Sequence, residues 1–191
     1  MSTDSDSDSA AVRSDSRISP VEPPYEGALS DTFARVMPPG VAPLKLFRTM
    51  ARNPRVLQRM FAGSFLDQGS ITLRDRELVI LRTCFRCKCE YEWGVHVAFF
   101  SERATLSNED VAATLKRDPQ DLPPHEALLI GLVDQLHDHA RVTDELWAGL
   151  ARHYTEEQML ELIALAGYYH TISFIANAAG VQAEAYAPRF A

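Results

Sequence analysis

The stretch CKCEYEWGVHV, from Cys87 to Val97, is the part of this sequence that decides the fold. It combines two thiols, two carboxylates, a tryptophan and a histidine. A solvent-exposed helix face rarely needs a thiol, and a core face rarely needs two glutamates and a histidine. A redox site, a metal site, an acid/base site and an ordinary piece of helix are the four interpretations to weigh.

The spacing inside the stretch favours acid/base chemistry. Glu92 and His96 are four residues apart, so on a helix they share one face. A carboxylate beside an imidazole fixes its tautomer and raises its pKa, which gives a tuned proton donor or acceptor. Cys89 lies three residues before Glu92, near the expected start of this helix, where the helix dipole favours a thiolate. The competing interpretation is a surface ion pair of little consequence.

Metal and redox interpretations have less support. Cys84-x-x-Cys87, Cys89 and His96 offer zinc ligands, but a closed structural site usually pairs two well-separated clusters, and the sequence suggests no second one. A thioredoxin-like site would need a βαβ pattern around the cysteines. We therefore expect no metal and no cofactor. Cys84 and Cys87 are interpreted as small buried residues.

The sequence around the stretch predicts an all-α fold of seven to nine helices. Thr72 with Asp75, Ser107 with Asp110, and Thr143 and Thr155 with their following polar residues give helix start signals before periodic apolar runs. Only VILRTCF resembles a strand, and its flanks have helical periodicity. The expected helices lie within 41–53, 54–69, 72–85, 89–104, 111–116 and 118–140, and after Thr143 and Thr155.

The chain of 191 residues, 46% hydrophobic and 24% charged, suits one globular domain. Residues 1–27 are rich in Ser, Asp and Pro and have few large apolar side chains, so we expect a disordered tail. Residues 28–191 would form the single domain. The net charge of −7 argues against nucleic acid as a partner, because phosphate binding needs a basic face.

The cysteine distribution favours a cytoplasmic protein. The chain has three cysteines, all between Cys84 and Cys89, whereas an extracellular disulfide framework links distant segments. No window approaches eighteen consecutive apolar residues, and the N-terminus has no apolar signal region. We expect no membrane partner.

Glu77 followed by Cys89-Glu-Tyr-Glu-Trp-Gly-Val-His96, within an all-α chain, resembles the carboxymuconolactone decarboxylase family, which shares its fold with alkylhydroperoxidase D. The resemblance extends from about Pro43 to Gln182. It implies an alkylhydroperoxidase D-like helical bundle that assembles into a homo-oligomer, a dimer, trimer or hexamer. Apolar segments such as LIALAGYYHTISFIANAAG support the expectation of self-association.

The resemblance also implies the catalytic residues. The alkylhydroperoxidase D branch carries a Cys-x-x-Cys-x-x-x-His motif and an upstream glutamate, which fall on Cys89, His96 and Glu77. The second redox cysteine is replaced by Glu92, so the usual dithiol is missing. The decarboxylase branch carries Glu-x-x-x-His without a dithiol, and Glu92 with His96 fits that pattern. We expect Glu77, Cys89, Glu92 and His96 to be catalytic.

Three functions remain open. The first is a cofactor-independent acid/base enzyme acting on a small carboxylated lactone or related cyclic acid, with Cys89 lining the pocket. The second is a thiol-dependent alkyl hydroperoxide reductase that uses Cys89 with Cys87 or Cys84 as its partner. The third is a helical oligomer that binds a ligand without catalysis.

Several other side chains are candidates for the substrate pocket. Tyr91 and Trp93 are packing residues that could also wall a pocket. His170 and Asn177 are seven residues apart, hence on one helix face, and either approach the pocket or form a core polar pair. His137 and His139 are interpreted as a solvated helix end. The candidate clamps for a substrate carboxylate are Arg74, Arg76, Arg82 and Arg86.

Overall fold

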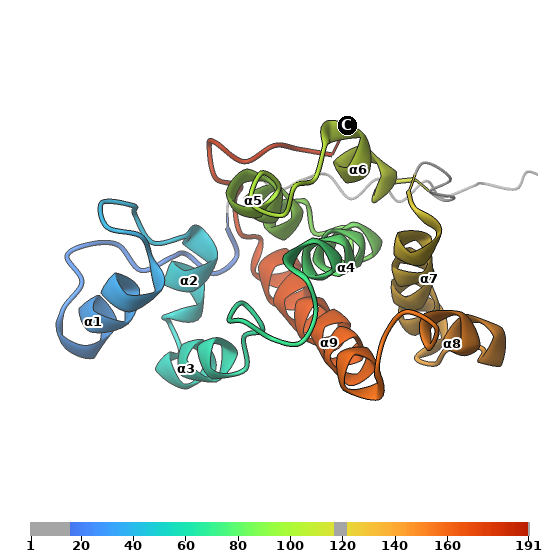
Figure 1. The fold of residues 1–191 in the computed structure, drawn as a ribbon. Helices are drawn as coiled ribbons and strands as arrows, with labels where there is room; N and C mark the ends of the chain where they lie inside the picture. The colour runs from blue at the N-terminus through green and yellow to red at the C-terminus, as the bar shows by residue number, and fades with distance from the viewer. Residues whose placement is uncertain (1–15, 117–121, 191) are drawn as a thin grey trace, which may run out of the picture.

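A computed structural model of the chain describes residues 16–116 and 122–190, and within them it contains nine α-helices and no strand (Figure 1). The predicted all-α class is confirmed. The helices are α1 (Gly27–Val36), α2 (Lys45–Met50), α3 (Pro54–Ala62), α4 (Leu73–Arg86), α5 (Glu90–Phe100), α6 (Asn108–Ala113), α7 (Pro124–His139), α8 (Asp144–Leu150) and α9 (Glu156–Ala179).

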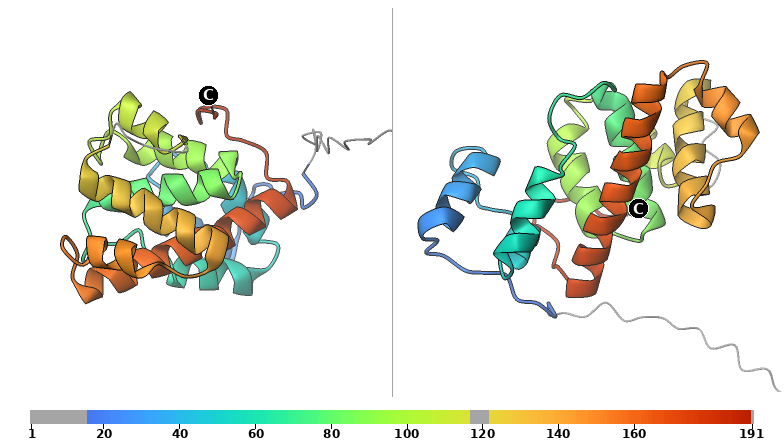
Figure 2. Two further views of the ribbon diagram at one scale, coloured as in Figure 1. Left: turned by 90° about the vertical axis from the view of Figure 1, so that its right-hand side faces the viewer. Right: turned by 90° about the horizontal axis from the view of Figure 1, so that it is seen from below.

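The helices lie on two sides of a central group. Figures 1 and 2 show α1, α2 and α3 on one side of α4, α5 and α9, and α7 with α8 on the other. Helix α4 packs against α5, α7 and α9, so it is the central element of the core. The site described below lies between this central group and the side formed by α1 to α3.

The start signals in the sequence have the expected geometry. The Thr72 side chain accepts a hydrogen bond from the Asp75 backbone N–H, which satisfies one free donor at the start of α4. Ser107 with Asp110 and Thr155 with Gln158 form complete capping boxes for α6 and α9. These local interactions explain why the starts of the helices were predictable.

The predicted end of the second helix at Gly69 is wrong, because α3 stops at Ala62 with Gly63 as its cap. The chain then runs across to α9 instead of continuing the helix. The Glu161 carboxylate accepts hydrogen bonds from the Ser70 backbone N–H and hydroxyl at 2.7 and 2.5 Å. This tertiary contact competes with helix extension and is invisible in the local pattern.

Helix α4 is buried along an unbroken run from Asp75 to Cys84, charged residues included. A buried charge is tolerated only when it is paired. Arg82, which is 2% exposed, donates two hydrogen bonds to the Asp134 carboxylate on α7 and others to backbone carbonyls. Because its charged side chains are paired, α4 is surrounded by protein even though it carries Glu77 and Arg82.

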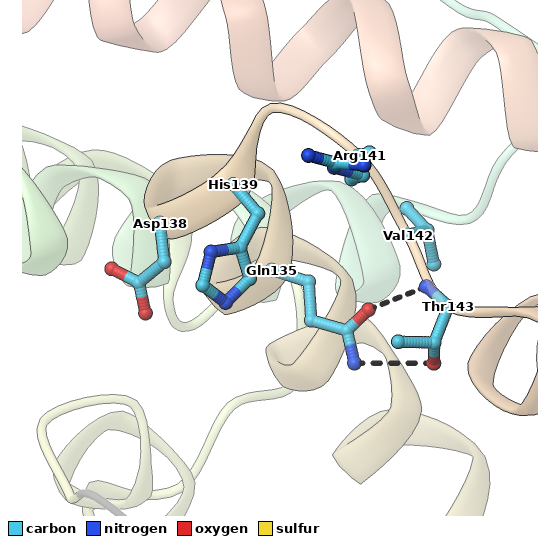
Figure 3. A pocket seen from close by; sticks show the side chains of 6 residues that line it. All are labelled: Gln135, Asp138, His139, Arg141, Val142 and Thr143. Atoms are coloured by element: carbon cyan, nitrogen blue, oxygen red, sulfur yellow. Dashed lines mark hydrogen bonds between the residues drawn. The ribbon is translucent and has the colours of Figure 1, made fainter.

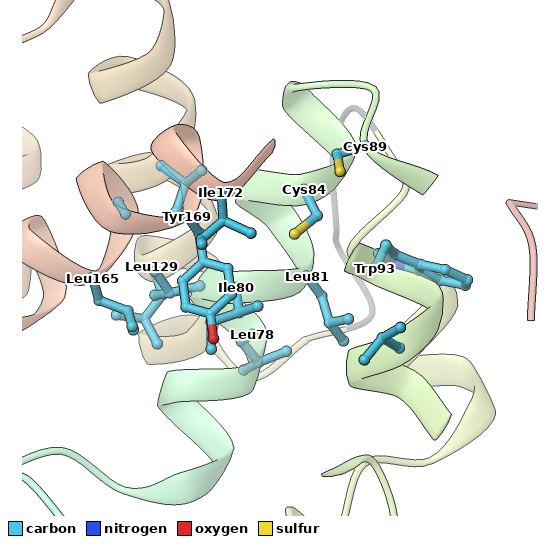
Figure 4. Close-up of a cluster of buried hydrophobic side chains, with 14 of the residues drawn as sticks. Leu78, Ile80, Leu81, Cys84, Cys89, Trp93, Leu129, Leu165, Tyr169 and Ile172 are labelled. Carbon is cyan, nitrogen blue, oxygen red and sulfur yellow. The ribbon is translucent and has the colours of Figure 1, made fainter. Parts of the chain in front are cut away.

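Helix α9 has the length and apolar composition of a membrane span, which the sequence reading had not expected. A central core helix meets the same criteria. Its buried side chains, among them Leu165 and Ile172, join the hydrophobic core that also contains α4 residues (Figure 4). Packing against α4, α5 and α7 accounts for this composition.

The predicted tail, residues 1–27, is only partly described, since residues 1–15 lie outside the described ranges. Residues 17–22 differ from the prediction because they pack against the domain. The Arg17 backbone N–H donates to the Ala179 carbonyl at 2.8 Å, and Arg52 donates to the carbonyls of Ser19 and Pro20. Arg52, two residues after the end of α2, and the last residue of α9 therefore hold a segment whose own composition suggested disorder.

Candidate active site

The turn between α4 and α5 brings Glu77 and His96 together. Cys87 caps α4, Lys88 adopts a left-handed backbone conformation, and the Cys89 N–H donates to the Cys84 carbonyl at 2.8 Å. Glu77 lies about 15 Å before this turn and His96 about 12 Å after it, at 1.5 Å per residue. In a tight antiparallel hairpin these two positions are opposite each other.

Glu77 connects a cation to the imidazole. Its Oε2 atom lies 2.7 Å from His96 Nδ1, and its Oε1 atom accepts from Arg76 Nε at 3.0 Å. Glu77 and His96 are 1% and 3% exposed at their side chains, so the contact is dry. The carboxylate fixes the imidazole with Nδ1–H toward Glu77, and the other ring nitrogen, Nε2, points away from it.

Glu92 lies at this second nitrogen, with its Oε1 atom 3.5 Å from His96 Nε2. The Glu92 Oε2 atom is buried and has no hydrogen-bond partner. An unpartnered buried carboxylate oxygen is costly for folding, so it marks a position where a ligand proton or hydroxyl would be stabilised. The predicted pairing of Glu92 with His96 on one helix face is confirmed.

His96 is held in its protonated form. Burial alone would lower the pKa of His96, but the negative charge and hydrogen bond of Glu77, together with those of Glu92, raise it to about 9. An imidazolium between two carboxylates is therefore the stable state at neutral pH. It is a proton donor whose acidity depends on both glutamates.

Two aromatic rings hold the imidazole in place. Phe100, one turn after His96, stacks on it with ring centroids 5.1 Å apart, and the Tyr169 ring contacts it edge-on at 5.0 Å. The Arg76 guanidinium lies over the Phe100 ring, 5.3 Å from the ring centroid. The sequence reading missed Phe100 and Tyr169 as site residues, although the four-residue spacing of Phe100 from His96 was a usable signal.

Glu92 and His96 face a cavity of about 590 Å³. Glu92 and His96 belong to its lining, and most of the remaining wall consists of apolar and aromatic side chains from α1, α2, α3, α5 and α9. A pocket of this volume suits a small molecule. Arg35 and Arg103 line it as exposed residues, and neither makes an ion pair with any described residue.

The four arginines proposed as carboxylate clamps are engaged elsewhere. Arg76 pairs with Glu77, Arg74 with Asp110 and Glu126, and Arg82 and Arg86 with Asp134. None of them lines the cavity. Arg35 and Arg103, which the sequence reading did not single out, are the cations placed to meet an anionic ligand.

The predicted pocket residues Tyr91, Trp93, His170 and Asn177 do not line the cavity, so this prediction is wrong. Tyr91 instead bonds the Leu46 N–H and the Glu184 carboxylate, and Trp93 packs on Phe190. Their side chains face the C-terminal segment, which crosses α5 on its other side.

His170 and Asn177 point toward the end of α4 instead of the cavity. The Asn177 side chain donates to the Cys87 carbonyl at 2.8 Å, and His170 contacts His137. The shared helix face of His170 and Asn177 was predicted correctly. The face itself is turned away from His96 and the cavity.

Cys89 caps α5 as expected, yet the predicted thiolate is wrong. The residue is 0% exposed, does not line the cavity, and lies within the hydrophobic cluster (Figure 4). Burial and the negative charge of Glu92 raise the pKa of Cys89 to about 12, and the nearby Glu92 N–H and Ser173 hydroxyl dipoles only partly offset them. At Cys89, desolvation raises the thiol pKa by more than the helix N-terminus lowers it.

The three cysteines are free thiols. Cys84 is buried, and burial raises its pKa well above the ordinary value. Cys87 is half-buried, and burial raises its pKa as well. The Ser173 hydroxyl, which makes no well-formed hydrogen bond, lies beside the thiols and lowers the pKa of each. The interpretation of Cys84 as a buried residue is confirmed, whereas Cys87 reaches the surface.

A second hollow, at the turn between α7 and α8, has a different character (Figure 3). The Gln135 side chain spans it, accepting from the Thr143 N–H at 2.7 Å. Asp138, His139 and Arg141 surround it, and none of them forms an acid/base pair comparable with Glu92 and His96. This hollow is the closing turn of a helical hairpin.

Residues 52–118 match the model of the carboxymuconolactone decarboxylase family, a segment that contains α4, α5 and every predicted catalytic residue. This segment of the chain is similar to that family. No functionally curated protein matches the sequence.

Solved structures with the same fold cover most of the chain. A peroxidase-related protein from Silicibacter sp. TM1040 is 13% identical, with a TM-score of 0.75, 91% of this chain covered and 96% of that one. The alkylhydroperoxidase AhpD core protein from Ralstonia eutropha JMP134 is 17% identical, with a TM-score of 0.74 and coverages of 88% and 93%. The debrominase Bmp8, in its apo form, is 18% identical, with a TM-score of 0.69 and coverages of 88% and 92%. These likenesses establish the alkylhydroperoxidase D-like fold.

Proposed function

We propose that the protein is an acid/base enzyme that needs no cofactor and acts on a small carboxylated lactone or related cyclic acid. The observation that carries the proposal is the joint presence of His96 Nε2 and the unpartnered Glu92 Oε2 in the wall of a mostly apolar cavity. The similarity of residues 52–118 to a family named for a decarboxylase supports the same chemistry.

In the proposed reaction the bond between the ring carbon and its carboxylate breaks, and carbon dioxide leaves. The electron pair left on that carbon takes up a proton, which His96 delivers from Nε2. Glu77 holds the opposite nitrogen at 2.7 Å and stabilises the imidazolium before transfer. Glu92 then returns a solvent-derived proton to the imidazole or accepts one from the substrate.

The lining of the cavity supports a substrate with an apolar body and an acidic group. Aromatic and aliphatic side chains would desolvate the ring, which favours loss of a charged carboxylate as neutral carbon dioxide. Arg35 and Arg103 are exposed at the lining and supply positive charge for binding or guiding the acid.

The alternative is a thiol-dependent peroxidase, and it is supported by the similar fold of two peroxidase-related proteins. Its reactive residue would be Cys89, whose burial and raised pKa oppose attack on a peroxide. The three neighbouring free thiols are the feature in its favour. Mass spectrometry after mild peroxide treatment distinguishes the two, since the acid/base proposal predicts an unmodified Cys89 and full activity.

The test of the proposal is turnover of a panel of carboxylated lactones and cyclic acids, followed by carbon dioxide release. We expect activity in the natural chain, and losses of about 10²–10⁴-fold in His96→Gln and Glu92→Gln. Glu102→Gln removes an exposed carboxylate beyond the end of α5 and is the matched control. Unchanged turnover in the first two variants would overturn the proposal. Binding without turnover in the natural chain would favour the ligand-binding oligomer.

A further inference from the structure

A second constellation of chemically active side chains lies where the end of α4 meets α7 and α9. Cys87, His137 and His170 come from these three helices or their caps, and each is half-buried. One ligand atom from each, the Cys87 sulfur and one nitrogen of each histidine, lies within 4.8 Å of the other two. The His96 site shares none of these residues.

The two imidazoles face each other through their ring nitrogens, with His137 Nδ1 2.9 Å from His170 Nε2. His170 Nδ1 lies 2.8 Å from the Ala166 carbonyl, so it carries the ring proton and donates. His170 Nε2 is therefore the nitrogen with the free lone pair. An outer hydrogen bond of this kind orients histidines that ligate metals.

We propose that Cys87, His137 and His170 form a binding site for a zinc ion, with a fourth position open to water. Thiolate and imidazole ligands select borderline and soft transition metals over magnesium and calcium. Three protein ligands and a solvent position are a known arrangement for zinc. Partial exposure of all three residues leaves an entry path for the ion.

The two histidine nitrogens need only a small movement to accept zinc. Tetrahedral bonds of about 2.0–2.1 Å from zinc to nitrogen place two ligand nitrogens about 3.4 Å apart. The nitrogens of His137 and His170 are 2.9 Å apart, so their rings would separate by a few tenths of an ångström. As the ion binds, the proton between the two nitrogens moves to His137 Nε2, and the Cys87 thiol loses its proton to solvent and binds as thiolate.

The surroundings fit a bound cation. Arg86 and Lys88 are the positive charges next to Cys87 in sequence. Arg86 is paired with Asp134 at 2.8 Å and with Asp138 at 2.6 Å, and Lys88 is exposed to solvent. The Arg86 charge is thereby compensated on the side of α7. Asn177 holds the Cys87 carbonyl at 2.8 Å and fixes the cap of α4 that carries the thiol.

Zinc at this site would join α4, α7 and α9 at one point. The proposal is independent of the proposed enzymatic function, because no ligand lines the cavity or contacts His96. A metal that binds only the folded chain raises its stability through linkage. The site would therefore stabilise the core helices that carry Glu77 and hold the cavity wall at Tyr169.

The test is titration of the full, reduced chain with Zn²⁺ and with Co²⁺ as a spectroscopic probe. We expect one equivalent to bind, a thiolate-to-cobalt charge-transfer band in the near ultraviolet, and a higher Tm with zinc. Cys87→Ser should abolish the charge-transfer band, and both His137→Gln and His170→Gln should weaken binding at least about tenfold. Circular dichroism of each apo variant checks that it is folded.

His139→Gln is the matched control, because His139 lies two residues from His137 on α7 but is exposed and outside the cluster. It should bind metal as the natural chain does. Absence of stoichiometric binding would overturn the proposal. Equal loss in His139→Gln, or binding that survives Cys87→Ser with its charge-transfer band intact, would overturn it as well. Preference for Cu⁺ over Zn²⁺ in competition would overturn the assignment of the metal.

Discussion

At the scale of single residues, His96 is the group on which the site depends. Its imidazole lies between two carboxylates and two aromatic rings, and the pKa of about 9 makes it cationic when the protein is folded. This protonation state decides which chemistry the cavity can support. It also makes the stability of the fold depend on pH.

The folded pKa of His96 is raised above the ordinary value of 6.5, so its protonation stabilises the folded state at low pH. The contribution is complete below pH 6.5 and is lost as the pH rises through about 9. A shift of this size corresponds to roughly 3 kcal/mol. We expect the free energy of unfolding, measured by urea denaturation, to fall across this window. His96→Gln should lack that slope, and an equal slope in both proteins would contradict the pKa.

Glu77 is a positioning residue for His96, because it contacts the imidazole and Arg76 but does not line the cavity. Glu77→Gln keeps the shape and removes the charge, so the pKa of His96 should fall. An NMR titration of the His96 ring measures this directly. Glu102→Gln should leave the His96 pKa unchanged, and a Glu77→Gln protein with a pKa still near 9 would show that Glu92 alone sets it.

At the scale of helices, close approach of the C-terminal segment to α5 depends on Gly94. A Cβ at this position would meet the Pro188 carbonyl oxygen, which is backbone and cannot turn aside. We expect Gly94→Ala to displace the segment that Glu90 and Tyr91 hold, at a cost of about 1–3 kcal/mol. Thermal unfolding measures the loss.

Gly167→Ala is the control for that substitution, since it lies in α9 with open space where the Cβ would be. Helix propensity predicts a neutral or slightly stabilising change of up to about 1 kcal/mol there. Equal destabilisation by both substitutions would contradict the steric explanation.

The sequence predicted those elements that depend on local interactions. The caps at Thr72, Ser107 and Thr155 act within four residues, so the starts of α4, α6 and α9 were readable. The end of α3 was not, because Glu161 bonds Ser70 across a long separation in sequence. The site residues divide in the same way, into those related by local spacing and those brought together by tertiary packing.

The pairing of Glu92 with His96 is local and was predicted, and Glu77 came from the resemblance to the family. Arg35, Arg103 and Tyr169 reach the cavity from separate elements, and no local pattern indicates that. His137 and His170 likewise meet Cys87 only through the packing of α7 and α9 on α4. For this reason the sequence suggested no second ligand cluster.

At the scale of the whole molecule, self-association stays a prediction. Leu160 and Phe174 on α9 are 68% and 61% exposed, which is unusual for large apolar side chains on a core helix. We expect sedimentation analysis to show a dimer, trimer or hexamer. A monomer whose sedimentation does not change with concentration would contradict this expectation.

The measurement that tests the central claim most directly is turnover of a carboxylated lactone or cyclic acid in D₂O. Proton delivery by His96 predicts release of carbon dioxide and one deuterium on the carbon that lost it. His96→Gln should slow both by about 10²–10⁴-fold. Turnover that is insensitive to His96 and is lost instead when Cys89 is oxidised or replaced by serine would contradict the account.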